Sequence, residues 1–433
     1  MKSLPTTWLA SSSPPSASSV GGGMTKEEEE EMMRDRGMHE SYTAFELPLA
    51  SDKDLLEKYV NVSGGVRTGK LLEHLDSLAG AVAYRHCLPS SASSPTIVSS
   101  ETFLKASSKA GLYLATASAD RLDMFKKLGR ENIMDLKYSG LVTYTGNSSM
   151  EVFVKMEGTV PGASDPPETL LLGRFSMVCR DSRTHKARRV PALKVESENE
   201  RDLWKIGEDH KRRKNESSMS ALDKVPPSSE EAKELHSLML QMVDHRKTLD
   251  GEEIVQMKDT KIESVQLMFP QDRNLHGKVF GGILMRLVSE LSNTRTQLKG
   301  FIQAFELCFT NAAIFASAPM RFLALDQITF RLPVPIGAVL RLSSKVVKTT
   351  KPHEGLDGEA KAHITVRCEV EEVDTGIRRE TNTFSFTMAK EDHTALGKTV
   401  VPSTYVEAMH YLEGKRRLKR GDEMRRLYGA GQM

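Results

Sequence analysis

The chain lacks the cysteine patterns and the long apolar runs that mark several classes of protein. Its four cysteines lie far apart, with no Cys-x-x-Cys motif and no histidine at zinc-ligand spacing: Cys87, Cys179, Cys308 and Cys368. This usage is typical of a reducing compartment, and it argues against a disulfide framework or a metal motif. No run of about 18 apolar residues occurs, because even the stretch 301–325 is interrupted by charged residues. We therefore predict no transmembrane helix.

A strong charge imbalance and the familiar catalytic signatures are absent as well. The net charge is only +2, which gives no indication of a nucleic-acid partner. Basic residues gather at 211–214 and 415–420, and we interpret them as solvated helix faces or linkers. None of the motifs Gly-x-Ser-x-Gly, His-Glu-x-x-His, Gly-x-Gly-x-x-Gly or the Walker phosphate loop is present. Any catalytic residues must therefore lie in a less common sequence pattern.

A glycine-rich string occurs twice in related forms. Residues 61–69 read NVSGGVRTG and residues 274–282 read NLHGKVFGG, and the same offset continues into the apolar positions that follow, so that Leu71 corresponds to Leu284. In each copy the apolar face of the following helix is kept while the polar face diverges. An internal repeat of this length indicates a duplicated domain.

Both repeats predict the same order of elements, a glycine loop, a long helix and several antiparallel strands. For the first unit we predict a helix over 70–87 and then strands near 112–117, 136–144, 150–156 and 170–179. For the second unit we predict a strand over 262–268, a helix from Gly282, and then strands near 320–330, 339–348, 363–373 and 381–388. One helix wrapped by a curled antiparallel sheet is an α+β architecture, whereas a doubly wound parallel sheet would need alternating helices.

These patterns divide the chain into five segments. We predict an unstructured N-terminus, a first domain, a charged linker with helical pieces, a second domain and a basic helical tail, over 1–45, 46–198, 199–254, 255–395 and 396–433. The first 25 residues are rich in serine and contain no acidic residue. This composition favours either an organelle transit peptide or a disordered start.

One segment of the second unit departs from the repeat. Between Ser292 and Met320 the helical pattern is interrupted by residues 295–310, which have no counterpart at the same offset in the first unit. We interpret this stretch as an insertion, either a lid or an error in the deduced sequence.

Asp76 is the first candidate for chemistry. It lies two helical turns after Gly69, within a stripe of leucines, and the corresponding residue of the second repeat is Ser289. Partial desolvation would raise the pKa of this carboxyl and suit a general base. The alternative is an exposed or capping aspartate, because Glu73 and His74 beside it are also polar.

The second glycine loop supplies the other candidates. Gly281 and Gly282 would let a ligand approach the N-terminus of a helix, where unpaired N–H groups attract oxyanions and carbonyl oxygens. Asn274 and His276 lie in the same loop, and Glu290 lies further on, within the helix predicted to follow it. Each has an ordinary alternative, as a turn residue, a structural histidine and a helix-face charge.

The combination of motifs resembles a known family. Asn-x-His-Gly-x-x-Phe-Gly-Gly before an amphipathic helix, with Arg-x-Gly-x-Leu-Leu-Glu-x-Leu-Asp-Ser-Leu-Ala in the partner repeat, is similar to the double hot-dog acyl-CoA thioesterases, closest to the mitochondrial acyl-coenzyme A thioesterase 9 type. Residues 121–124 and 138–140 of the first repeat and 324–330 of the second also match. The resemblance covers roughly residues 55–195 and 255–390.

The resemblance implies two hot-dog domains paired as a pseudo-dimer, with one composite site between them. Asp76 would activate a water, Asn274 would hold the water or the thioester, and Gly281, Gly282 and His276 would contact the thioester. The pseudo-symmetric site of Asn61, Ser289 and Glu290 lacks the aspartate and would be degenerate. The substrate would be an acyl-CoA, hydrolysed to a fatty acid and CoA without metal or cofactor. The resemblance also implies a homo-oligomer in the mitochondrial matrix, or otherwise in the cytoplasm.

Two other functions stay open from the sequence. A hot-dog dehydratase acting on hydroxyacyl thioesters would need a histidine facing an acid, and His276 has no evident partner of that kind. A non-catalytic acyl-CoA-binding or regulatory protein would be consistent with the interrupted second repeat. Turnover of an acyl-CoA would separate the enzyme from the binding protein.

Overall fold

The computed structural model describes residues 25–429 apart from 62–63, 89–105, 127, 220, 223, 244–247, 250, 269–295, 327, 330–331, 333, 335–336 and 356–357. The helices are α1 Lys26–Met32, α2 Met38–Ser41, α3 Lys53–Glu57, α4 Thr68–Cys87, α6 Glu198–Met219, α7 Ser229–Val243, α8 Thr296–Ala316 and α9 Tyr405–Gly429, with 3-10 turns at η2 Met257–Thr260 and η4 Pro352–Glu354. The strands are β1 Arg36–Gly37, β2 Thr43–Leu47, β3 Leu112–Met124, β4 Asp135–Thr145, β5 Ser149–Thr159, β6 Glu168–Asp181, β7 Leu193–Lys194, β8 Thr248–Leu249, β9 Glu252–Gln256, β10 Ile262–Leu267, β11 Met320–Leu325, β12 Ile328–Thr329, β13 Val339–Thr350, β14 Lys361–Glu371, β15 Arg378–Lys390 and β16 Lys398–Val401.

One continuous sheet joins the two halves of the protein. Its strands run in the order β10-β13-β14-β15-β11-β3-β6-β5-β4-β2, with β12 beside β3, and every pairing within it is antiparallel. The halves meet where β11 pairs with β3, through Leu325 opposite Leu122 and Ala324 opposite Asp123. The predicted strands are therefore confirmed in kind and order, and the predicted side-by-side pairing of the two units is confirmed at this junction.

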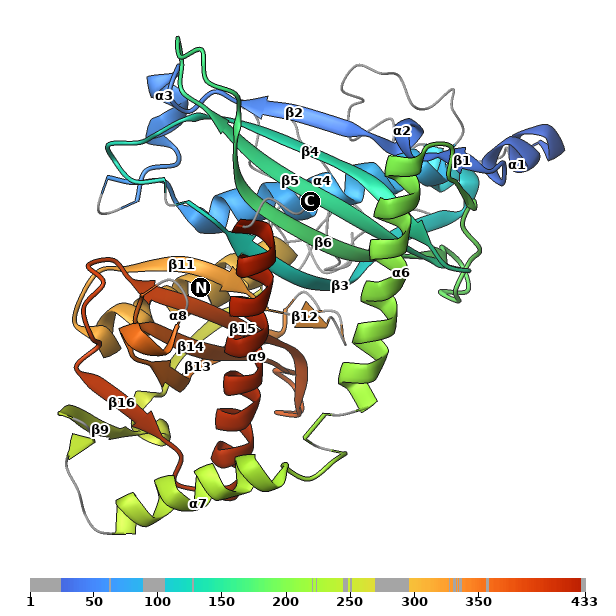
Figure 1. Ribbon diagram of the computed structural model, residues 1–433. Coiled ribbons are helices and arrows are strands. Elements are labelled where there is room, and N and C mark those ends of the chain that lie inside the picture. The colour runs from blue at the N-terminus through green and yellow to red at the C-terminus, as the bar shows by residue number, and fades with distance from the viewer. Residues whose placement is uncertain are drawn as a thin grey trace, which may run out of the picture.

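Helix α4 is the central helix of the first half. Fourteen of its 20 residues are buried, including Leu71, Leu72, Leu75 and Leu78. A helix with so broad a buried face packs against other elements over most of its surface, and α4 lies behind the β3–β6 sheet in Figure 1. It ends at Cys87, and Leu88 is already extended, as expected of a residue that precedes proline in the sequence.

Helix α8 is the central helix of the second half, and it corrects one prediction. The segment 295–310, interpreted from the sequence as an insertion, belongs almost entirely to α8. Its buried residues fall at helical spacing on one face: Ala304, Phe305, Cys308, Ala312 and Phe315. Phe305 packs edge-on against Phe322 of β11 and Phe386 of β15. The part of the segment whose burial is described, 303–310, thus contributes Ala304, Phe305 and Cys308 to the core. The predicted helix from Gly282 lies outside the described residues.

The opposite face of the sheet is covered by the two helices that flank the second half in sequence. Figure 1 shows α6 crossing the first half and α9 crossing the second, both in front of the sheet, with α4 and α8 behind it. Tyr144 of β4 contacts Trp204 of α6, and Lys348 of β13 donates a hydrogen bond to Tyr411 of α9. None of the described helices is long and apolar enough to span a membrane.

The N-terminal prediction needs a correction. The sequence predicts no structure before residue 46, yet residues 26–45 contain α1, β1, α2 and part of β2. Helix α1 begins with a capping box in which Thr25 and Glu28 bond each other's backbone, and Glu28 also pairs with Lys109. Acidic residues at a helix N-terminus interact favourably with the helix dipole. Glu27, Glu28 and Glu29 therefore lie in the first turn of a helix, within the segment predicted to be unstructured.

Candidate functional site

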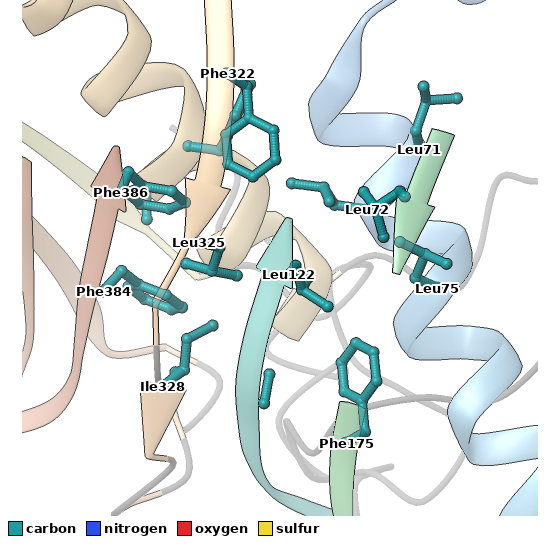
Figure 2. Packing of buried hydrophobic residues seen from close by; sticks show 14 of the residues in the cluster. Leu71, Leu72, Leu75, Leu122, Phe175, Phe322, Leu325, Ile328, Phe384 and Phe386 are labelled. Carbon is teal, nitrogen blue, oxygen red and sulfur yellow. The ribbon is translucent and has the colours of Figure 1, made fainter. Parts of the chain in front are cut away.

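Asp76 lies in the middle of α4, between the leucines that pack against the sheet. The residue keeps a minor part of its surface exposed, while its neighbours Leu75 and Leu78 are fully buried. Figure 2 shows Leu72 and Leu75 of α4 on the side of the helix nearest Leu122 of β3 and the apolar residues at the junction of the two half-sheets. The carboxyl is thus held at the boundary between water and the core.

Thr116 of β3 is the partner that holds this carboxylate. Its hydroxyl donates a hydrogen bond of 3.1 Å to Oδ1 of Asp76, and Thr116 is itself buried. Burial raises the pKa of Asp76 to about 6, and the hydrogen bond from Thr116 opposes that rise. A carboxylate with this pKa is mostly ionised at neutral pH and remains basic enough to accept a proton from water. No pattern in the sequence indicates Thr116, because it stands among ordinary strand residues and its pairing with Asp76 spans 40 positions.

The first glycine loop is a turn closed by its own asparagine. The side-chain oxygen of Asn61 accepts a 3.0 Å hydrogen bond from the N–H of Gly65, and Gly64 adopts a positive φ of 82° that favours glycine. Val60 and Val66 form an isolated antiparallel bridge at the base of the loop. In this loop, then, asparagine shapes the turn that leads into α4.

The N-terminus of α4 also contacts the second half. Arg67, the residue before the first helical turn, forms an ion pair with Glu306 of α8. Both side chains are about half exposed, at 41% and 49%. This pair is a contact between the glycine loop of the first half and the central helix of the second.

Helix α8 has a buried polar residue of its own. The side-chain amide of Asn311 donates hydrogen bonds to the carbonyl of Thr260 at 3.0 Å and to the hydroxyl of Ser344 at 2.9 Å. Asn311 is 2% exposed. An amide with these buried partners ties the helix to the sheet and carries no charge for catalysis.

The remaining predicted site residues cannot be placed. Asn274, His276, Gly281, Gly282, Ser289 and Glu290 all lie in 269–295, outside the described residues. Of the predicted site residues, the structure therefore places Asp76 and Asn61. It puts Asp76 in the partly desolvated environment expected of a base, rather than in that of an exposed or capping aspartate.

Comparison with known proteins identifies the family. The chain is 34% identical over 391 residues to a mouse protein named acyl-coenzyme A thioesterase 9, mitochondrial, covering 89% of this chain and 78% of the mouse protein. It is 33% identical over 387 residues to the human protein of the same name, covering 88% and 77%. The chain belongs to the family of acyl-CoA thioesterases.

The acyl-CoA thioesterase assignment agrees with the fold. Each half consists of one long helix lying against an antiparallel sheet, and these are the two hot-dog domains of the family, joined through β3 and β11. Among solved structures, an acyl-CoA hydrolase from Staphylococcus aureus is similar at a TM-score of 0.33 and 17% identity, covering 41% of this chain and 95% of that one. No protein-family model matches the chain. The protein is a thioester hydrolase, and its expected substrate is an acyl-CoA.

Proposed function

We propose that Asp76 is the general base of the thioesterase reaction and that it acts in one composite site. The second half would complete this site with Asn274 and with the backbone N–H groups near Gly281 and Gly282. His276 would stand beside the thioester in the same loop. The proposal combines the described environment of Asp76 with the repeat in the sequence, which gives the second half its own asparagine and glycine loop.

In the proposed reaction, the Asp76 carboxylate removes a proton from water as the water oxygen attacks the thioester carbonyl. The backbone N–H groups near Gly281 and Gly282 would stabilise the negative charge that develops on the carbonyl oxygen. The tetrahedral intermediate collapses with cleavage of the C–S bond. The proton held by Asp76 passes to the departing sulfur, which leaves free CoA and a fatty acid. Asp76 returns to its starting state, and no metal is needed because the thioester carbonyl is already electrophilic.

The environment of Asp76 is the observation that carries this proposal. The carboxyl has a raised pKa of about 6, a hydroxyl partner in Thr116 and a minor exposed surface through which water can reach it. A structural aspartate is normally held by several donors or by a cation, which lowers its pKa. Among the described residues, Thr116 is the hydrogen-bond partner of this side chain.

We infer that the pseudo-symmetric site is degenerate. It would combine Asn61 with Ser289 and Glu290, and it would have no aspartate at the position corresponding to Asp76. The side chain of Asn61 already accepts a hydrogen bond from its own loop. This supports a structural role for Asn61.

The proposal also covers the cellular location of the protein and its self-association. We propose that the protein acts in the mitochondrial matrix, because the mouse and human relatives are named mitochondrial. Fusion of the full chain to a fluorescent protein, imaged against a matrix marker, tests this location.

Self-association through the hot-dog halves stays a prediction, and light scattering after gel filtration measures it.

The mechanism is tested by turnover of a panel of acyl-CoA thioesters. The substitution Asp76→Asn keeps the shape of the side chain and removes the base, so kcat should fall by roughly 10²–10⁴-fold. Asp54→Asn is the matched control, since Asp54 is an exposed aspartate on α3 of the same half. Unchanged turnover in Asp76→Asn would refute the role of Asp76, and the panel would also define the preferred acyl length.

A further inference from the structure

A second group of chemistry-bearing residues lies on the sheet face opposite Asp76. Asp120 of β3, Glu151 of β5 and His210 of α6 place one ligand atom each within 4.8 Å of one another. These three residues come from segments far apart in the sequence, so no short sequence motif indicates that they lie together. Thr116 of the same strand β3 bonds Asp76 on the α4 side, whereas Asp120 meets α6 on the other side.

Helix α6 packs closely against the sheet in this region. Gly207, one turn before His210, lies so close to the sheet that a Cβ atom there would come within 2.8 Å of Cβ of Tyr144 and 3.2 Å of Oε1 of Glu151. One turn earlier still, Trp204 packs on the ring of Tyr144 with centroids 5.6 Å apart. The absence of a side chain at Gly207 therefore allows α6 to approach Glu151 closely, and this places His210 near the carboxylates of Asp120 and Glu151.

The donor groups of the cluster suit a cation. Glu151 is buried, and its Oε1 accepts hydrogen bonds from Thr143 at 3.2 Å and from Arg174 at 3.3 Å. The positive charge of Arg174 offsets the negative charge of the Glu151 carboxylate. A second carboxylate, that of Asp120, lies near Glu151 and His210. A neutral His210 imidazole would offer a nitrogen lone pair to a metal ion at this point.

We propose that Asp120, Glu151 and His210 form a binding site for a divalent cation, which we call the α6 cation site. One neutral imidazole and two carboxylates form a donor set that suits zinc. Thr143 and Arg174 would act as outer-sphere partners that orient Glu151. The guanidinium also repels a cation, so zinc should bind more weakly here than at a fully anionic structural centre.

The cation would fasten α6 to the outer face of the first half. Helix α6 begins the segment that leads from the first half to the second, and it covers the sheet in Figure 1 from the side opposite α4. The site is therefore separate from the hydrolysis chemistry proposed for Asp76. Its occupancy would change how firmly the linker is held, not the reacting groups.

Zinc binding to chelator-treated full-length protein tests the site. The sequence contains two tryptophans, Trp8 and Trp204, so a Trp8→Phe background leaves Trp204 of α6 as a local fluorescent probe. We expect saturable binding of one zinc ion per chain by calorimetry, a change in Trp204 emission with the same midpoint, and a higher Tm. Absence of a saturable response would overturn the proposal.

Variants of the ligands locate the ion. His210→Ala and Asp120→Asn should each weaken zinc binding by more than the ~10–100-fold typical of losing an outer-sphere partner. His236→Ala is the matched control, because His236 is exposed on α7. Asp120 is only half-buried, so its variant keeps the test usable if His210→Ala fails to fold. Binding that survives both ligand variants, or that is lost in His236→Ala, would show that zinc binds elsewhere.

Discussion

Helices α4 and α8 occupy corresponding places in the two halves, but their polar residues differ in kind. Helix α8 buries an amide, Asn311, whose hydrogen bonds run to Thr260 and Ser344. Helix α4 carries an acid, Asp76, that is held by the Thr116 hydroxyl and has a raised pKa. A satisfied amide stabilises a fold, whereas a partly desolvated acid costs stability and gains basicity. If Asp76 acts as the proposed base, α4 supplies chemistry and α8 supplies structure at corresponding places in the two halves.

The largest expected effect is a difference in hydrolysis rate between a variant of α4 and a variant of α8. Normalised to folded protein, Asp76→Asn should hydrolyse acyl-CoA at least about 10²-fold more slowly than Asn311→Ala, because in the proposed mechanism Asp76 is the base. Steady-state kinetics on the same substrate, with circular dichroism to quantify folded protein, makes the comparison. Equal losses in the two variants would remove the distinction between a chemical and a structural helix.

Stability should change in opposite directions in the same two variants. Asn311→Ala leaves buried partners without their donor and should cost about 1–3 kcal/mol. The folded pKa of Asp76, about 6, lies above its ordinary value of 3.8, so its cost to stability grows as pH rises from about 4 to 6 and stays constant above that. Asp76→Asn removes this cost and should stabilise the protein by about 1–3 kcal/mol at pH 8. Denaturant unfolding at pH 4 and pH 8 measures both changes, and a destabilised Asp76→Asn at pH 8 would contradict the assignment.

The pH profile tests the link between Asp76 and Thr116. Hydrolysis should rise with pH through about 6, as Asp76 loses its proton, and then level off. Thr116→Val removes the hydrogen bond that lowers this pKa, so the midpoint should move to higher pH. Initial rates over a pH series for both proteins give the two midpoints. Ser118→Ala is the control, because it removes a second buried hydroxyl of the same strand and should leave the midpoint in place.

The smallest effect is expected where the two halves touch through exposed charges. Glu306→Gln breaks the ion pair between α8 and Arg67 of the first glycine loop. Because both side chains are about half exposed, the cost should be about 0–1 kcal/mol. Denaturant unfolding at low and high salt measures it. A large loss would mean that this pair, rather than the junction of β3 with β11, holds the halves together.

Much of each half could be predicted because its signals are local. The leucines of α4 fall at helical spacing, and the alternating residues of β4 and β5 indicate strands within a few residues of their observed bounds. Helix α8 was not predicted from the sequence. The constant offset between repeats predicts a helix from Gly282, which lies outside the described residues, and the apolar stripe of α8 from Ala304 to Phe315 begins within the segment interpreted as an insertion.

The sequence by itself determined that the chain is duplicated, that each half has a central helix before antiparallel strands, and that one half alone carries an acid at Asp76. These are matters of residue order and periodicity. Only the tertiary structure decided that Thr116 holds Asp76, that Leu122 meets Leu325 at the junction, and that His210 reaches Asp120 and Glu151. Such contacts join residues tens to hundreds of positions apart, so they leave no local period in the chain and arise only when the sheet closes and the helices pack upon it.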